Sequence, residues 1–149
     1  KTPSVLALTR QGVVNGRTEH RSDNLSAKGA YVLREAAGPR AATLIATGSE
    51  VGLALEAADK LAADGVHAAV VSMPSMELFR AQDAAYRTSV LGDARRVIVE
   101  AGVASGWHEW MREGDVFIGM SGFGASAPAG TLYKHFGITV DAVVAAVRG

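Results

Sequence analysis

The sequence predicts an α/β fold, a three-layer sandwich in which helices cover both faces of a mainly parallel sheet. The run ATLIA at 42–46 is apolar without alternation, as strands buried on both faces are. Over 51–62 the apolar residues change to spacings of three and four, the pattern of an amphipathic helix. Because such strands and helices alternate along the chain, we expect right-handed crossovers between parallel strands.

Length and composition restrict the class of protein. The 149 residues suffice for one domain, or for one domain with an appendage. The 15 basic residues balance the 15 acidic ones, which disfavours nucleic acid and anionic membranes as partners. The chain has no cysteine, no membrane-spanning apolar run and no signal peptide pattern, so we expect a cytoplasmic protein. Since no methionine precedes Lys1, we also expect a fragment or a processed chain.

The N-terminal third contains two strand candidates separated by a polar stretch. SVLALTRQG at 4–12 predicts a strand over 4–9 that ends at Arg10. Residues 15–28 are polar, rich in turn formers and without periodicity, which predicts a linker or a long surface loop. A short strand is expected next, over 30–35.

The remaining elements follow the same alternation. The helix over 51–62 should end at Asp64 and Gly65, where the glycine suits a left-handed C-cap. Pro128 is compatible with the first turn of a helix, and Gly137 with a helix end. The other predicted strands are 66–75, 95–102 and 115–121, and the other predicted helices are 82–91, 128–137 and 140–149.

The segment ATGSEV at 46–51 is a candidate anion site, since it places a glycine turn between a strand and a helix start. It lacks the further glycines of a dinucleotide fingerprint and the Gly-Lys-Ser/Thr of a phosphate loop. A helix cap by Ser49 explains the pattern as well, and we favour it. A free-standing nucleotide-binding module that uses the Gly48–Ser49 turn is the alternative.

Other candidate groups indicate no chemistry by their spacing. The scattered histidines show no metal-site pattern, and we expect most of them at the surface: His20, His67, His108 and His135. Trp107 and Trp110 are typical of a core or an interface. The glycine-rich stretch 119–128 predicts a tight turn or a loop packed against another chain. Residues 29–149 therefore look like a domain that supports chemistry located elsewhere.

Several blocks, in this order and at these separations, resemble the C-terminal end of transketolase. They are TRQ at 9–11, AKGAYVL at 27–33, LIATGSEVGLALEAADKLAADGV at 44–66, VVSMPSMELFRAQDAAYRTSVL at 70–91, VEAGVASGW at 99–107, GMSGFGASAP at 119–128 and FGITVDAVV at 136–144. The likeness also explains the missing methionine, because transketolases are several times longer than this chain.

The resemblance implies a thiamine diphosphate enzyme of the pentose phosphate pathway and Calvin cycle. It transfers a two-carbon ketol unit from a ketose phosphate to an aldose phosphate, and it needs a divalent cation, Mg²⁺ or Ca²⁺. The cofactor supplies the difficult chemistry. The groups that bind the cofactor and the metal should precede Lys1, so the resemblance implies no catalytic, cofactor-binding or metal-binding residue here and an isolated chain without activity.

The resemblance also divides the chain. Residues 1–20 correspond to the tail of the pyrimidine-binding domain, 21–28 to a linker and 29–149 to the transketolase C-terminal domain. That domain is implied to hold a mainly parallel five-stranded sheet whose first strand, 30–35, runs antiparallel. Family members are homodimers, and we expect 119–128 with Trp107 and Trp110 to contact the second subunit.

One substrate contact is implied. Arg10 in TRQ matches the arginine that the family's SRQ motif directs at the sugar phosphate, and a guanidinium offers paired donors that suit a phosphate. An interdomain ion pair is the alternative role. The sequence departs from the family at Gly12, usually asparagine, and at 121–125, usually Thr-Thr-Phe-Gly-Glu. Deoxyxylulose phosphate synthase, the 2-oxoacid dehydrogenases and a purely structural dimerisation domain remain alternatives.

Overall fold

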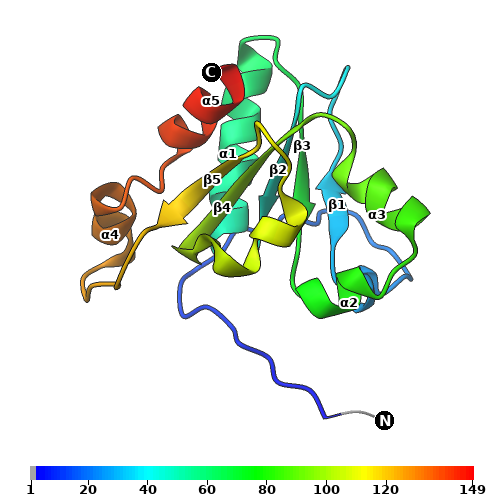
Figure 1. Ribbon diagram of the computed structural model, residues 1–149, viewed down its shortest axis with the longest axis horizontal. Coiled ribbons are helices and arrows are strands. Elements are labelled where there is room, and N and C mark those ends of the chain that lie inside the picture. Colours follow the sequence, from blue (N-terminus) through cyan, green and yellow to red (C-terminus); the bar gives the residue numbers. More distant parts are fainter. Residues whose placement is uncertain (1–2) are drawn as a thin grey trace.

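A computed structural model describes residues 3–149 and confirms the predicted α/β class (Figure 1). Its five-stranded sheet has the order β1-β3-β2-β4-β5. β1 runs antiparallel to β3, and the other neighbouring strands are parallel. The strands are β1 (Tyr31–Arg34), β2 (Ala42–Ala46), β3 (Ala68–Ser72), β4 (Arg95–Val103) and β5 (Val116–Met120).

Helices cover both faces of the sheet, which makes the three layers. They are α1 (Glu50–Ala63), α2 (Met76–Arg80), α3 (Ala84–Leu91), α4 (Ala129–His135) and α5 (Val140–Arg148). Short 3₁₀ turns lie at η1 (Leu25–Lys28), η2 (Ala104–Gly106) and η3 (His108–Trp110). None of these helices is long and apolar enough to cross a membrane, within residues 3–149.

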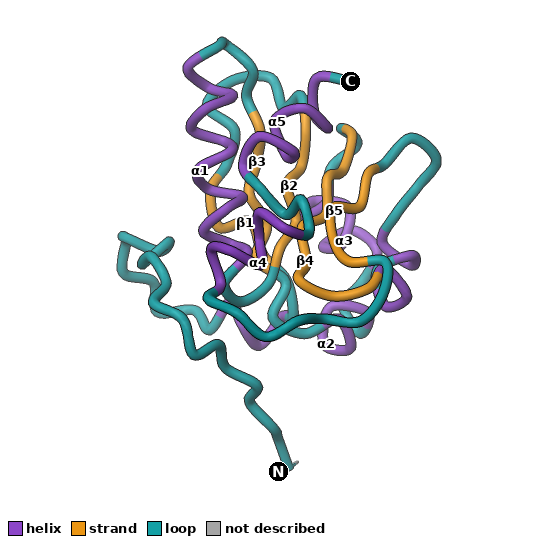
Figure 2. The backbone as a smooth tube through the Cα atoms, turned by 90° about the vertical axis from the view of Figure 1, so that its left-hand side faces the viewer, coloured by secondary structure: helices purple, strands orange, loops and turns teal. Residues whose placement is uncertain are grey.

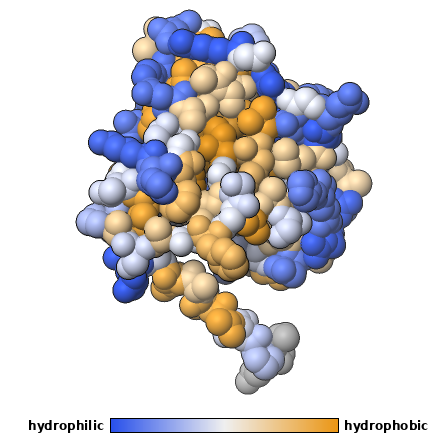
Figure 3. Space-filling view, turned by 60° about the vertical axis from the view of Figure 1, so that its left-hand side comes forward, coloured by the Kyte–Doolittle hydropathy of each residue, from blue (hydrophilic) through white to orange (hydrophobic). Residues whose placement is uncertain are grey.

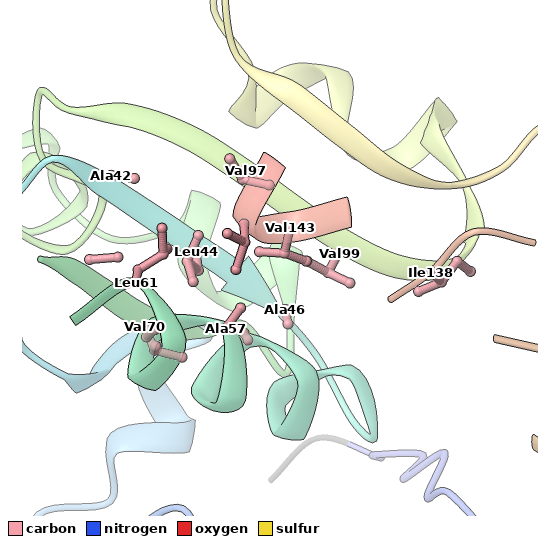
Figure 4. Packing of buried hydrophobic residues seen from close by; sticks show 14 residues of the cluster. Ala42, Leu44, Ala46, Ala57, Leu61, Val70, Val97, Val99, Ile138 and Val143 are labelled. Carbon is pink, nitrogen blue, oxygen red and sulfur yellow. The ribbon is translucent and has the colours of Figure 1, made fainter. Parts of the chain in front are cut away.

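Two apolar clusters form the core, one on each face of the sheet. Alternate residues of β2, Leu44 and Ile45, lie in different clusters because successive side chains of a strand point to opposite faces. Leu44 packs with Leu61 of α1 and Val143 of α5 (Figure 4). The second cluster joins Ile45 to Phe79 of α2 and to residues of α3 and η3.

Gly65 ends α1 as the sequence predicts. Its φ is 77°, its N–H donates to the carbonyl of Ala62, and the N–H of Val66 donates to that of Leu61. This pair of bonds is a Schellman motif, which a residue with a Cβ adopts only with strain. Gly137, with φ 70°, follows α4 in the same conformation.

The predicted cap by Ser49 is wrong. Ser49 has helical dihedral angles, and its side chain accepts no bond from the helix; its hydroxyl donates instead to Glu50 Oε1 at 3.0 Å. A capping side chain needs an extended backbone to reach the free N–H groups. Asp83 has that conformation, and its carboxylate accepts from the N–H of Tyr86 at 2.7 Å.

The predicted strand over 4–9 is also absent, since residues 3–9 have no regular secondary structure. This segment projects from the body of the fold, with Val5 97% and Leu8 81% exposed (Figures 2 and 3). An apolar run becomes a strand only when another strand pairs with its backbone, and none in residues 3–149 does so. The predicted linker contains a short turn, η1, that the sequence did not indicate.

Candidate functional site

A cavity of about 830 Å³ lies at the carboxyl ends of β4 and β5, where Ala101 and Met120 line it. Its other walls come from residues 8–11, from 124–127, from α4 and from Phe136 and Ile138 behind that helix in the sequence. The loop between β5 and α4 runs along this side of the molecule (Figure 2). Open parallel sheets commonly bind ligands outside the carboxyl ends of their strands, so this cavity is the candidate site.

Arg10 lines this cavity from the N-terminal segment. Next to it, the N–H of Gln11 donates to Thr9 Oγ1 at 3.2 Å, which bends the chain at this point. Arg10 is exposed, and its side chain makes no ion pair or hydrogen bond with the rest of 3–149. Its guanidinium therefore keeps its N–H donors available for a phosphate or a carboxylate.

Tyr133 of α4 lines the same cavity and contacts a buried acid. Its hydroxyl donates to Glu50 Oε1, and it lies 3.1 Å from Ser49 Oγ. Glu50 is only 4% exposed. Burial, followed by the hydrogen bond to Glu50, raises the pKa of Tyr133 above its usual value. The phenol therefore stays protonated and stabilises the carboxylate.

Glu100 of β4 is a second acid near the same end of the sheet. Burial raises its pKa to about 7, and the negative charge of Glu50 adds to this shift. A hydrogen bond with the side chain of Trp107 acts in the opposite direction. The protonation of Glu100 therefore changes near neutral pH.

The Gly48–Ser49 turn is poorly suited to an anion. The carboxylate of Glu50 lies beside it, with Oε2 3.9 Å from the position that a Cβ on Gly48 would take, and it already binds the Ser49 hydroxyl. A second negative charge here would be repelled. The structure therefore gives no support to a nucleotide site at this turn.

The structure places the histidines apart, as expected. His20, His108 and His135 are exposed, and His67 is half-buried beside Gly38. Within residues 3–149, no group of three or more histidine and carboxylate side chains could hold a metal ion.

The expectation that Trp107 and Trp110 contact a second subunit is wrong. They are only 3% and 5% exposed, and both belong to the apolar cluster beside η3, where Phe79 lies 5.0 Å from the Trp110 ring centroid. Residues 121–128 of the glycine-rich loop are exposed, Phe123 completely so.

Sequence reasoning missed the Tyr133–Glu50 contact and the partial burial of Glu100. Glu50 follows a glycine turn at a helix start. Acidic residues are common at that position because they stabilise the helix dipole, so nothing in the neighbouring residues indicated that Glu50 is buried. Its partner is 83 residues away in the sequence. Only the folded chain brings these groups together.

The chain resembles known proteins along nearly its whole length. The family model of the transketolase-like TK C-terminal domain matches residues 29–139. The transketolase of Sinorhizobium medicae is 59% identical over 145 residues, which are 97% of this chain and 21% of that protein. The chain thus spans about a fifth of the length of the curated relatives it matches.

Solved structures show the same relationship. Transketolase from Leishmania mexicana is 46% identical, with a TM-score of 0.75 over 83% of this chain and 18% of that one. Pichia stipitis transketolase in complex with sedoheptulose 7-phosphate is 33% identical, with a TM-score of 0.74 and the same coverage. An inactive β4 tetramer of a split-gene transketolase is 26% identical, with a TM-score of 0.68 over 93% of this chain and 46% of that one.

Proposed function

This chain belongs to the family of transketolase-like C-terminal domains, and we propose that it is the C-terminal part of a transketolase. The parent enzyme moves a two-carbon ketol unit from a ketose phosphate to an aldose phosphate in the cytoplasm. The observation that carries this proposal is the 59% identity to a transketolase over nearly the whole chain. The other relatives described above are also transketolases, which favours this enzyme over deoxyxylulose phosphate synthase and the 2-oxoacid dehydrogenases.

Thiamine diphosphate and a divalent cation, Mg²⁺ or Ca²⁺, belong to the parent enzyme in this proposal. Within 3–149, no group of three or more histidine and acidic side chains is placed to hold the cation. We assign the binding of both groups to parts of the parent outside this chain.

The chain itself has a structural role in this proposal and supports a homodimer of the parent. We assign 1–20 to the tail of the pyrimidine-binding domain, 21–28 to a linker and 29–149 to the C-terminal domain. The family match begins at residue 29, and the buried core begins at Ala30. The inactive β4 tetramer of the split-gene relative supports the expectation that this chain alone is inactive.

Arg10 binds the phosphate of the sugar in this proposal. It is exposed beside an open cavity and has no carboxylate partner in 3–149, which argues against an ion pair within this chain. A relative has been solved with a phosphorylated sugar.

The test is Arg10→Ala in the parent enzyme, with hydroxypyruvate as the unphosphorylated donor. We expect kcat/KM for ribose 5-phosphate to fall roughly 10- to 150-fold, since a charge-assisted contact is lost. The value for glycolaldehyde should barely change because it has no phosphate. Arg10→Lys should recover part of the loss, and Arg17→Ala, an exposed arginine of the same segment, should behave like the wild type. Equal losses with both acceptors would exclude the phosphate role.

The cofactor assignment has a separate test. Calorimetry should find no saturable binding of thiamine diphosphate with Mg²⁺ to the 149-residue chain. Saturable binding would contradict the domain assignment, whatever the role of Arg10.

A further inference from the structure

Tyr133 of α4 faces the segment that carries Arg10 across the main cavity, the one of about 830 Å³ at the carboxyl ends of β4 and β5. Residues 9–11 and Tyr133 line this cavity together. In the division of the chain proposed above, 1–20 and α4 belong to different domains of the parent enzyme. A contact between them therefore joins two domains at the proposed substrate site.

The N-terminal segment has few contacts that determine its course. The backbone of residues 3–22 makes no hydrogen bond with another described backbone group, and the residues before the turn at 9–11 project from the fold (Figure 2). Gly16 packs on the domain, since a Cβ there would lie 2.9 Å from Leu33 and 3.2 Å from Leu55. The turn itself needs a further contact with the domain if Arg10 is to stay at the cavity.

The side chain of Gln11 supplies that contact, because it forms a hydrogen bond with the hydroxyl of Tyr133. Burial and the bond to Glu50 raise the pKa of Tyr133, whereas the bonds with Ser49 and with Gln11 act in the opposite direction. Lowering the pKa of a phenol is the effect of a donor to its oxygen. The Tyr133 hydroxyl thus accepts from Gln11 while it donates to Glu50.

Tyr133 is itself held by the start of α1. Its hydroxyl donates to Glu50 Oε1 and lies 3.1 Å from Ser49 Oγ, and the Ser49 hydroxyl donates to the same carboxylate oxygen at 3.0 Å. Glu50 is only 4% exposed. Because a side chain with such supporting hydrogen bonds keeps one orientation, the phenol oxygen offers Gln11 an acceptor in a fixed place.

We propose that Tyr133 is a positioning residue for the sugar phosphate: held by Glu50, it binds Gln11 and thereby orients the adjacent Arg10 toward the cavity. This inference rests on the proposed role of Arg10. A guanidinium binds a phosphate best in one planar geometry, so a displaced Arg10 binds it less well. The C-terminal domain then contributes to substrate binding although none of its groups touches the substrate.

The test uses Tyr133→Phe and Gln11→Ala in the parent enzyme, with hydroxypyruvate as the donor. Each variant should lower kcat/KM for ribose 5-phosphate roughly 2- to 10-fold, since one hydrogen bond between neutral groups is lost. The value for glycolaldehyde should barely change, because that acceptor has no phosphate. A merely structural role of Tyr133 would lower both values equally.

Two double variants test whether these residues act as one unit. Tyr133→Phe combined with Gln11→Ala should lose no more than the larger of the two single losses, because both changes remove the same contact. Arg10→Ala combined with Gln11→Ala should lose no more than Arg10→Ala, because Gln11 acts through Arg10.

Matched control variants make the same changes elsewhere in the chain. Tyr31→Phe removes a hydroxyl that makes no hydrogen bond within 3–149. Gln82→Ala removes a side chain that donates to the carbonyl of Leu78 at 2.9 Å. Neither residue lines the main cavity, so both variants should match the wild type with either acceptor.

Equal losses with both acceptors, or no loss in either single variant, would overturn the inference. Additive losses in either double variant would also overturn it. If Tyr133→Phe fails to fold, Gln11→Ala tests the same contact from an exposed residue. Failure of the proposed function is distinguishable, because Arg10→Ala itself would then affect both acceptors equally. Failure of this inference alone leaves Arg10→Ala selective for ribose 5-phosphate.

Discussion

The hydroxyl of Tyr133 donates a hydrogen bond to the buried carboxylate of Glu50, and this contact ties α4 to the first turn of α1. The two elements are far apart in sequence, and α4 lines the main cavity. The bond therefore determines where α4, and with it one wall of the main cavity, is held.

Tyr133→Phe should destabilise the chain by about 1–3 kcal/mol, because it removes a donor from a buried carboxylate. Urea unfolding followed by circular dichroism measures the loss. Tyr31→Phe is the matched control, since Tyr31 is half-buried and its hydroxyl makes no hydrogen bond within 3–149. Equal effects of the two variants would show that the contact adds no stability.

Glu100 should make stability depend on pH near neutrality. Its pKa is about 7 in the folded chain and near 4.5 when unfolded, so the folded state binds the proton more tightly. Stability is then greatest below pH 4.5 as far as this group is concerned, and it falls as the pH rises to about 7. The loss should be on the order of 1–3 kcal/mol after allowance for partial exposure.

Glu100→Gln should remove this dependence, which urea unfolding at pH 5, 6, 7 and 8 measures. Asp115, whose pKa is lowered despite its burial because backbone N–H groups and Arg112 bind it, contributes a slope of the opposite sign at lower pH. The two groups therefore affect stability in different pH ranges. If the free energy of unfolding of Glu100→Gln still changes with pH between about 5 and 7 as in the wild type, another group is responsible for the titration.

Two glycines with similar dihedral angles should respond differently to alanine. Gly65, with φ 77°, has no atom within 4 Å of its Cβ position, so Gly65→Ala should cost roughly 1–2 kcal/mol of backbone strain. Gly29, with φ 82°, would place its Cβ 2.1 Å from Phe79 N and 2.4 Å from Ser75 O. Gly29→Ala should therefore cost roughly 1–3 kcal/mol more. Equal melting temperatures would contradict this.

Gly122→Asp should weaken assembly of the parent enzyme but leave the stability of this chain within about 0.5 kcal/mol. Gly122 is exposed and has open space at its Cβ position, so the fold tolerates the change. A charge in an interface would be desolvated without a partner. Sedimentation of the parent enzyme measures the strength of the dimer. The control is Ser105→Asp, at an exposed residue of η2. If both variants form equally strong dimers, the loop is not part of the interface.

The sequence patterns predicted the elements whose causes are local. Gly65 and Gly137 follow helix ends because glycine adopts a positive φ more easily than other residues do. The continuous apolar run at 42–46 and the helical spacing over 51–62 identify their elements directly. The antiparallel direction of β1 came from the family resemblance and not from the residues. α2 was missed because its five residues are shorter than the window that reveals a helical period.

The wrong predictions have a common physical origin, because each depended on which group contacts the residue in the folded chain. The strand predicted over 4–9 lacks a neighbour with which to pair. Trp107 and Trp110 were interpreted as subunit contacts because composition does not show which surface covers an aromatic residue. Ser49 was predicted to cap a helix from its position alone, whereas Glu50 takes its hydroxyl.

The irregular edge at β1 has a consequence for aggregation. An edge strand presents unpaired backbone groups to which the edge of another molecule can add. β1 is only four residues long, its register with β3 shifts between Val32 and Arg34, and Arg34 is held by Asp59 at 2.8 Å. Short length, an irregular register and a charged end all obstruct the growth of a continuous sheet across molecules. Association of molecules through the β1 edge is thus disfavoured, even though Val5, Leu6 and Leu8 of the N-terminal segment are exposed.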